Sequence, residues 1–377
     1  MGTSLKYVRL TLVLLATARV GAQNPTPVPP MPVEPITAIL GAFRTHEIVA
    51  ISDPHGNVQL QTFLRSLIHD ARFPAAVEDI VIETLSARYQ DAIDRFVRGD
   101  DVARDVLRKA WEDHTVPGTG TQVEDMLSAV RAINASLGSD RKVRVIAGDP
   151  PIDWDNVRSR EDHRRWIELR DSYPADLIRR QVLERGRRAL VVYGQGHLQR
   201  RQIVSNYDMS TWQAQTVVSM LERDAGARVF NIWTLLDRNA ELPEGVASWR
   251  VPSLAIMQGT TLGAADFGRY FRGLGDGTRF AVRNVGGAAA TYQLVPLSRD
   301  EWKTMRMEDQ FNALLYLGAP SSMTDAPMPV ALCEDAQFVK TRLDRLTLFA
   351  PPFEVDNFKK ACGAWNIDGS DSQAALR

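Results

Sequence analysis

The stretch ALVVYGQGH, residues 189–197, is a run of apolar residues that ends in two glycines and a histidine. A continuous apolar run of this length is typical of a strand buried on both faces, as in a parallel sheet. Four further runs have the same character, being rich in Val or Ile and bounded by turn residues. They are EIVAIS (47–52), DIVIET (79–84), KVRVIAGD (142–149) and RVFNIWTL (228–235).

Helical patterns lie between these strands. The clearest has its apolar residues at the spacing of one helix face, at Leu60, Phe63, Leu64, Leu67 and Ile68. Further helices are expected at 86–97, 101–113, 122–137, 160–185 and 210–224. Alternating strands and helices indicate βαβ units, so the sequence predicts an α/β fold with a mostly parallel sheet covered by helices on both faces.

The beginning of the chain has the pattern of an export signal. Lys6 and Arg9 precede a short apolar run at 10–18, and small residues occupy 20–22. That run is about half of the ~20 apolar residues that span a membrane. We therefore expect a signal peptide at 1–22, cleaved to leave a periplasmic or secreted protein without a membrane anchor.

The rest of the chain divides by composition. Residues 23–36 are rich in proline and predict a stiff, extended linker. We assign 37–350 to one α/β domain and 351–377 to a C-terminal tail. Beyond about residue 238 the text becomes rich in Gly and Ala, apart from the strand-like FNALLYLG (311–318) and a helical pattern near 335–348. We interpret this part as long irregular insertions in the same domain.

The charge and cysteine content narrow the possible partners and cofactors. Lys and Arg number 45 against 46 Asp and Glu, for a net charge of −1, which removes the electrostatic case for a nucleic-acid partner. Two cysteines are too few for a zinc ribbon, so a metal would need the six histidines and the carboxylates. In an oxidising compartment Cys333 and Cys362 can form a disulfide, and two buried free thiols are the alternative.

Histidines and acids follow several of the predicted strands. Asp53 and His55 come after the first strand, Glu83 closes the second, Asp149 closes the third, and His197 follows the fourth. Ligands of open parallel sheets bind at the carboxyl ends of the strands, where these side chains would meet. Imidazole and carboxylate together suit a divalent metal or general acid–base chemistry on water.

Each of these residues also has a structural interpretation. Glu83 could cap the following helix, and Arg88 one turn later could pair with it or hold an anionic intermediate. Asp149 could form a turn or orient an imidazole. The twelve arginines of 158–201 favour a solvated helix face, with a rim for anionic substrate groups or haem propionates as the alternative. The remaining histidines are interpreted as remote from the chemistry, namely His46, His69, His114 and His163.

Two families carry similar motifs. ISDPHGN (51–57) resembles the opening DxHGN of calcineurin-like metallophosphoesterases, but the later motifs of that family are incomplete here. The better match is the superfamily of Tiki, ChaN-like and erythromycin-esterase-like proteins, which carry two GxxH motifs with a Glu between them. GQGH (194–197) resembles the second GxxH and SDPH (52–55) the first, with Glu83 as the intervening acid. This resemblance covers about residues 40–236.

The resemblance implies several activities. Tiki proteins are metal-dependent peptidases in which these histidines and the Glu surround the ion, erythromycin esterases use a His as general base, and ChaN-like proteins bind haem and are exported. Two positions depart from the pattern. Ser52 replaces a Gly, which would narrow access to the backbone, and Asp53 is shorter than the Glu often found there.

Together these patterns predict an exported hydrolase-like protein that cleaves an ester, lactone or amide bond of a small molecule or peptide. His55 would be the general base or a metal ligand, His197 the second ligand or acid, and Glu83 a ligand or water activator. Asp53, Arg88 and Asp149 would support them. A divalent metal is a candidate cofactor. The alternatives are a haem- or iron-binding uptake protein without catalysis, a catalytically silent relative and, as the weakest, a metallophosphoesterase.

Overall fold

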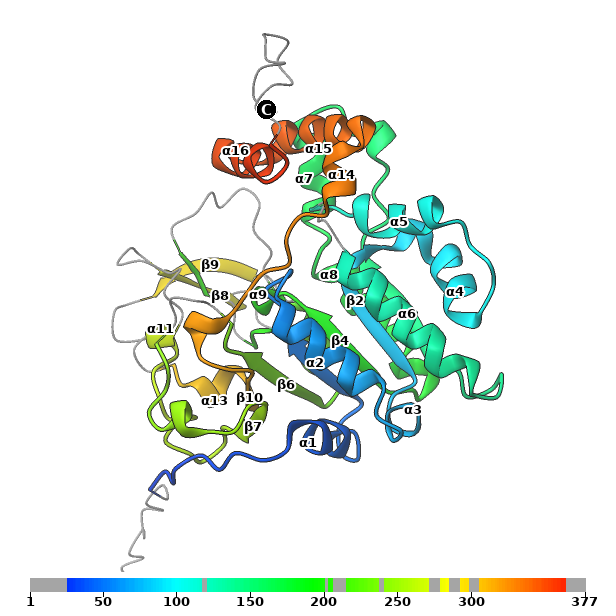
Figure 1. The fold of residues 1–377 in the computed structure, drawn as a ribbon. Helices are drawn as coiled ribbons and strands as arrows, with labels where there is room; N and C mark the ends of the chain where they lie inside the picture. The colour runs from blue at the N-terminus through cyan, green and yellow to red at the C-terminus, as the bar shows by residue number, and fades with distance from the viewer. Residues whose placement is uncertain are drawn as a thin grey trace, which may run out of the picture.

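A seven-stranded sheet in the order β3-β2-β4-β1-β6-β10-β7 forms the centre of the protein (Figure 1). Neighbouring strands run parallel, apart from the antiparallel pair of β10 and β7. The strands are β1 (Ile48–Ser52), β2 (Asp79–Ser86), β3 (Arg144–Asp149), β4 (Ala189–Tyr193), β6 (Val229–Thr234), β7 (Ser253–Ile256) and β10 (Ala313–Tyr316). The predicted α/β class with a mostly parallel sheet is confirmed.

The structure is a computed structural model. It describes residues 26–116, 121–200, 203–205, 215–236, 241–270, 279–284, 292–297 and 305–363. The predicted signal peptide at 1–22 lies outside these residues. No helix within the described ranges is both long and apolar enough to cross a membrane.

Helices cover both faces of the sheet, because alternate residues of each strand point to opposite sides. On β1, Val49 and Ile51 belong to one apolar core, while Ile48 and Ala50 belong to the other. The first core is covered by α1 (Pro35–Ala42), α2 (Val58–Ile68), α3 (Phe73–Ala76), α4 (Gln90–Arg98), α5 (Arg104–Glu112) and α6 (Thr121–Ala135). The second is covered by α8 (Ser172–Gln181) and α10 (Val217–Asp224).

The strand order brings three strand ends together. β4 lies between β2 and β1, so the segments that follow these three strands leave the sheet side by side. The short helix α9 (Gln195–Leu198) follows β4 directly, and the 3₁₀ helix η1 (Ala87–Tyr89) follows β2. Side chains from distant parts of the sequence therefore converge at one edge of the sheet.

The helix expected at 160–185 is interrupted. The structure has α7 (Arg160–Ile167), then a turn at 168–171, then α8 and the 3₁₀ helix η3 (Leu183–Arg185). The side chain of Ser159 caps the first of these helices by accepting from the backbone N–H of Asp162. The prediction of one long helix was wrong, and the turn that replaces it enters the candidate site.

The second half of the chain contains more regular structure than the sequence suggested. A separate antiparallel sheet is formed by β5 (Ile203–Ser205), β8 (Arg279–Asn284) and β9 (Tyr292–Leu297) in the order β5-β8-β9. The strand-like FNALLYLG contains β10 at the predicted place. Short helices α11 (Phe267–Tyr270) and α13 (Met307–Gln310) and the 3₁₀ turns η5 (Val246–Ser248) and η7 (Pro320–Ser322) also belong to this part, whereas the 3₁₀ turn η2 (Trp154–Asn156) lies earlier, between β3 and α7.

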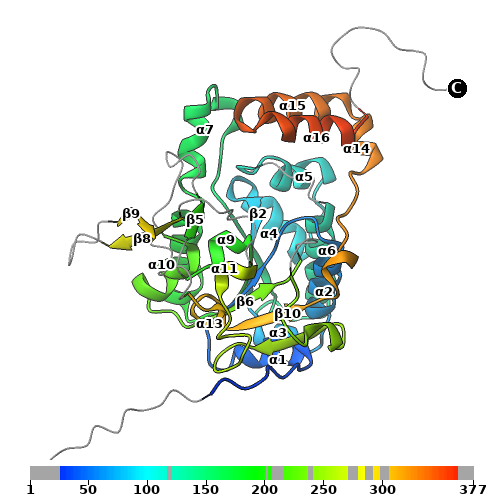
Figure 2. The same ribbon diagram turned by 90° about the vertical axis from the view of Figure 1, so that its left-hand side faces the viewer.

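The C-terminal helices form a small unit beside α5 and α7 (Figures 1 and 2). They are α14 (Val330–Glu334), α15 (Ala336–Phe349) and α16 (Pro352–Ala361). Phe338, Leu346 and Phe358 make their apolar core. Cys333 and Cys362 form the predicted disulfide, which joins α14 to the residue after α16. Residues 352–361, assigned to the tail from the sequence, thus pack on α15.

The described part of the proline-rich segment, 26–34, lies along β7. The backbone N–H of Val33 donates to the carbonyl of Leu254, and the N–H of Leu254 donates to the carbonyl of Val33. The N–H of Val28 donates to the carbonyl of Gly259, and the carbonyl of Val28 accepts from Thr261. Both valines keep the N–H that proline lacks, so they can bond where their neighbours cannot. The segment is attached at these points to the domain that it precedes.

Candidate active site

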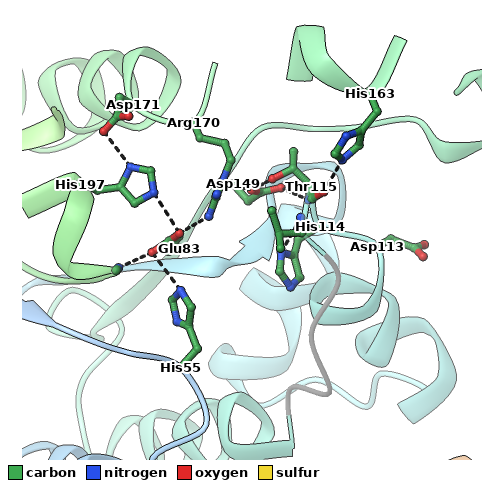
Figure 3. A network of polar contacts seen from close by, with 12 residues as sticks. His55, Glu83, Asp113, His114, Thr115, Asp149, His163, Arg170, Asp171 and His197 are labelled. Carbon is green, nitrogen blue, oxygen red and sulfur yellow. Dashed lines mark hydrogen bonds and ion pairs between the residues drawn. The ribbon is translucent and has the colours of Figure 1, made fainter. Parts of the chain in front are cut away.

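The carboxylate of Glu83, on β2, lies between the imidazole rings of His55 and His197, which follow the neighbouring strands β1 and β4 (Figure 3). Glu83 is 3% exposed and lies where β2 bulges, past its last pairing with β4. Nε2 of His55 is 3.4 Å from Oε2 of Glu83, and Nε2 of His197 is 3.4 Å from its Oε1. The three residues predicted as catalytic from their strand-end positions are therefore neighbours.

Two further groups hold the Glu83 carboxylate. The guanidinium of Arg170 donates to Oε1, and the backbone N–H of Gly194 donates to Oε2. Arg170 comes from the turn between α7 and α8, and Gly194 directly follows β4. Both carboxylate oxygens of Glu83 are thus engaged by donors of the protein itself. Arg170 was not among the residues predicted for the site from the sequence.

His197 is oriented by a buried acid from the same turn. Its Nδ1 is 2.8 Å from Oδ1 of Asp171, and this oxygen also accepts from the backbone N–H of Val217 at 3.1 Å. The bond fixes the ring so that Nε2 points to Glu83. Asp171 is 4% exposed and was also missed by the sequence analysis.

Gly194 is required by the closeness of these groups. A Cβ atom at this position would lie 3.1 Å from Oε2 of Glu83 and 3.5 Å from both the His55 and the His197 ring. A side chain here would press on the Glu83 carboxylate, while both rings would lie at ordinary contact distance. The first glycine of GQGH therefore gives the site its central space.

His55 lies on a strained turn at the mouth of the site. Its φ is 62°, a left-handed value that is uncommon for residues other than glycine. Oδ1 of Asp53 accepts from the backbone N–H of His55 at 2.8 Å, and Oδ2 is 3.4 Å from Nδ1 of the ring. The side chain of His55 is 41% exposed, whereas that of His197 is 19% exposed. Asp53 therefore contacts both the backbone and the ring of His55.

The turn that carries His55 is also held from outside. The backbone N–H of Ala326 and the side-chain amide of Gln122 each donate to the carbonyl of Gly56 at 2.9 Å. The backbone N–H of Val58 donates to the carbonyl of Thr324 at 2.9 Å. A segment far along the chain, between β10 and α14, therefore clamps the turn.

From the sequence, Ser52 was expected to narrow access to the backbone of the site, and the structure shows that it does not. Its Oγ is 2.8 Å from Oγ1 of Thr234 and accepts from the backbone N–H of the same residue at 2.8 Å. The side chain therefore points across the sheet to β6 and ties the two strands together. The backbone near His55 is not covered by it.

The charges around Glu83 shift the ionisation of its neighbours. Burial lowers the pKa of both histidines, but the carboxylates outweigh it. Glu83 and Asp53 raise the pKa of His55 to about 10, and Asp171 and Glu83 raise that of His197 to about 9. Burial raises the pKa of Glu83, yet the two imidazoles and Arg170 hold it well below its usual value. At neutral pH the site is a carboxylate surrounded by three cations.

Asp149 belongs to a second polar network that adjoins the first (Figure 3). Its carboxylate accepts from the backbone N–H of Thr115 at 2.7 Å and from the hydroxyl at 2.5 Å, and lies 3.9 Å from Nε of Arg170. His163, expected to be remote, is buried here with Nε2 2.8 Å from the carbonyl of Thr115. Burial raises the pKa of Asp149 to about 7. Asp149 supports Arg170 rather than orienting an imidazole.

Arg88 lies away from Glu83. Its guanidinium is 3.3 Å from Oδ1 of Asp153, and its side chain is 41% exposed. It lines a separate cavity between α5 and α15. The pairing with Glu83 considered from the sequence does not occur, because η1 carries Arg88 to that other side, and Arg170 occupies the place beside the carboxylate.

The donor set does not fit a metal ion. His55, Glu83 and His197 do converge, but Glu83 already accepts from Arg170 and Gly194 on both oxygens. A cation ligated by Glu83 would lie beside the guanidinium of Arg170, and the repulsion between the two positive charges opposes its binding. Within the described ranges no group of three His, Cys, Asp or Glu side chains is arranged to hold a metal.

Comparisons with known proteins were made for the whole chain and its fold. No protein-family model matches the sequence, and no curated protein matches it. Among solved structures it is similar to a succinoglycan biosynthesis protein, with 10% identity over 77% of this chain and 94% of the other and a TM-score of 0.48. A mutant of the erythromycin esterase EreC in its open conformation has 10% identity over 78% and 94%, with a TM-score of 0.43.

A third similar structure is that of ChaN of Campylobacter jejuni, solved for its cofacial haem binding. It has 10% identity over 54% of this chain and 86% of the other, with a TM-score of 0.35. The structures similar to this chain thus include an erythromycin esterase and a ChaN protein, which represent two of the families that its motifs resemble. The roles of residues in this chain rest on its own geometry.

Proposed function

We propose that the protein is a hydrolase that cleaves an ester, lactone or amide bond without a metal ion. The observation that carries this proposal is the convergence of two imidazoles on one carboxylate, with both Nε2 atoms 3.4 Å from its oxygens. The two rings differ in exposure and in partner, which suits them to different roles in one proton-transfer reaction.

His55 is the general base in this proposal because it lies at the open side of the site. With a pKa of about 10, His55 is neutral in only a small fraction of molecules at neutral pH, so hydrolysis should become faster as the pH rises toward 9. In that neutral form, Nε2 takes a proton from water, and the water oxygen attacks the carbonyl carbon of the substrate. His197 remains protonated and gives its Nε2 proton to the leaving oxygen or nitrogen. Since Asp171 holds Nδ1, only Nε2 of His197 faces the reacting groups.

Glu83 and Arg170 set the electrostatics of the reaction. Glu83 is 3% exposed and accepts from protein donors on both oxygens, so it acts as the counter-charge of the two imidazoles rather than as the base that attacks water. The guanidinium of Arg170 places a fixed positive charge beside the two rings. Fixed charges of this kind stabilise the oxyanion that develops on the substrate carbonyl.

Export belongs to the same proposal. The N-terminal sequence has the pattern of a signal peptide, and the Cys333–Cys362 disulfide suits an oxidising compartment. We propose a periplasmic or secreted enzyme whose substrate is a small molecule or a peptide. The balanced charge gives no support to a nucleic-acid partner.

The test is a panel of ester, lactone and peptide substrates offered to the wild type, to His55→Ala and to His197→Ala. Loss of hydrolysis in both variants supports the proposal, and His69→Ala, an exposed histidine at the end of α2, is the matched control. Wild-type rates in both variants would overturn it. A Soret band after haem addition, with no hydrolysis, would instead favour haem binding.

A further inference from the structure

A cavity of about 380 Å³ lies between α5, the loop around η2 and helix α15, away from Glu83 and the two site histidines. Its walls are rich in charged and aromatic side chains. Five cations, which are Lys109 and four arginines that include Arg342, and five acids line it, and its aromatic residues are Tyr89, Trp154 and Phe338.

Three of these arginines are already neutralised. Arg88 pairs with Asp153 at 3.3 Å. Arg345 pairs with Asp113 at 2.6 Å. Arg108 pairs with Glu112 at 2.8 Å and with Asp335 at 3.3 Å. These pairs use four of the five acids in the walls.

Arg342 is the exception. Its residue is 9% exposed, and its Nε has no hydrogen-bond partner. Among the residues that the structure describes, no carboxylate lies within ion-pair distance of its guanidinium, although Glu112 and Glu354 act on it from farther away. Burial and the neighbouring Arg345 lower the pKa of Arg342 to about 10, so it remains charged at neutral pH.

The walls carry five cations and five acids, so their formal charge is balanced, and a positive excess arises only where one of the acids is protonated. Lys109 also has no ion pair within the described ranges, and among the acids of the cavity the same is true of Asp155. Burial raises the pKa of Glu112 to about 7, so this carboxyl is only partly ionised at neutral pH. A buried cation without a partner is costly, and an anion from solution would relieve that cost.

We propose that this cavity binds the oxyanion group of a small molecule, a phosphate or a carboxylate, with Arg342 as its anchor. The planar guanidinium presents its donors in a fork that matches both groups. Lys109 adds a second cation from α5, and Tyr89, Trp154 and Phe338 provide apolar surface for the rest of the ligand. The site is independent of the hydrolytic function proposed for the Glu83 site.

The cavity adjoins the Glu83 site through three consecutive residues. Asp113 lines the cavity and accepts from Arg345. Thr115, two residues later, binds Asp149, which lies 3.9 Å from Nε of Arg170. His114 between them is buried. Residues 113–115 therefore connect the wall of the cavity, where Arg345 pairs with Asp113, to Asp149 and Arg170 beside Glu83.

The test is thermal unfolding of the full-length protein in inorganic phosphate, compared with chloride at the same ionic strength. At ten times the dissociation constant, the wild type should gain roughly 3 °C in Tm. Arg342→Met should lose this gain and, having no unpaired charge to bury, should unfold at the same or a higher temperature in chloride. The control Arg65→Met, an exposed arginine on α2, should keep the gain.

Calorimetric titration distinguishes phosphate from carboxylate ligands. It also provides a second variant in case Arg342→Met does not fold. Phosphate and benzoate are titrated into the wild type and into Arg342→Lys, which keeps the charge but not the fork. Binding of either probe to the wild type, weakened about tenfold or more in Arg342→Lys, supports the site and names the class. Equal affinity in wild type and variant, or binding of neither probe, would overturn it.

Discussion

The ends of β1 and β4 deliver a histidine to the same carboxylate in opposite ways. His55 sits on a strained turn, is 41% exposed and faces Asp53 at 3.4 Å. His197 sits in a short helix, is 19% exposed and is held by Asp171 at 2.8 Å. One ring is open to solvent and the other is fixed from behind, which is the asymmetry that a base and an acid need.

The comparison also shows where the support for each ring comes from. The β1 turn is clamped from outside by the segment around Thr324 and Ala326. The β4 end is supported from within, by Asp171 and by the close packing at Gly194. Changes to shared groups should therefore affect both sides, while changes to one support should affect one side only.

Removing the shared carboxylate should have the largest effect. Glu83→Gln leaves Arg170 and two imidazolium groups without their counter-charge, so the free energy of unfolding should fall by about 3–5 kcal/mol and hydrolysis should be lost. Urea denaturation measures the first and substrate turnover the second. Glu47→Gln, which removes the exposed Glu47–Arg228 pair, should cost less than about 1 kcal/mol. Similar losses in the two variants would remove Glu83 from the centre of the site.

Removing each ring should separate the two sides. His55→Ala and His197→Ala should each lower kcat by roughly 10²- to 10⁴-fold, because each removes a proton-transfer group. Only His197→Ala should also lower Tm, by about 2–4 °C, because it leaves the buried Asp171 without its strongest partner. Turnover and thermal unfolding of the two variants provide the measurement. A lower Tm in His55→Ala alone would reverse the assignment.

Removing each orienting acid should have a smaller effect. Asp171→Asn should lower the pKa of His197 and reduce kcat about tenfold, since the ring loses a buried partner. Asp53→Asn should lower the pKa of His55 and leave that of His197 in place. Imidazole titration by NMR in both variants distinguishes them. A shift of both rings in either variant would mean that the two ends are not independently supported.

The dependence of stability on pH tests the ion pairs of both rings together. The folded pKa values of His55 and His197, about 10 and about 9, are raised above the unfolded value of 6.5. Their stabilising contribution is therefore complete below pH 6.5 and is lost as the pH rises through 9 and 10. The stability difference between the wild type and the double alanine variant should shrink over this range in urea titrations. A difference that grows with pH would contradict the assignment.

Much of the fold could be predicted from the sequence because the central strands are buried on both faces. The predicted strand at 47–52 corresponds to β1, and that at 189–194 to β4, since strands covered on both faces are apolar throughout. The positions of His55, Glu83 and His197 followed from the rule that side chains after parallel strands share one edge. The small antiparallel sheet was missed. β5 pairs with β8 across more than seventy residues, and β8 and β9 lie on either side of a stretch rich in Gly and Ala.

Arg170 and Asp171 were missed because they lie among many arginines that suggest a solvated helix. The structure ends one helix before them and starts another at Ser172, which places both side chains at the site. Pro174, near the beginning of α8, was the available signal, since proline is tolerated in the first turn of a helix and disfavoured in its interior. Their contacts with Glu83 and His197 depend on tertiary structure and could not be read from local sequence.

The clamp on the His55 turn has a consequence for how the protein is made. The turn follows the first strand, but the bonds to it come from residues near 324–326, which are synthesised more than two hundred residues later. A nascent chain that has just completed β6 already contains both histidines and Glu83, yet it lacks the segment that holds one of them. The backbone bonds that hold the His55 turn from outside can therefore form only after residue 326 has been synthesised.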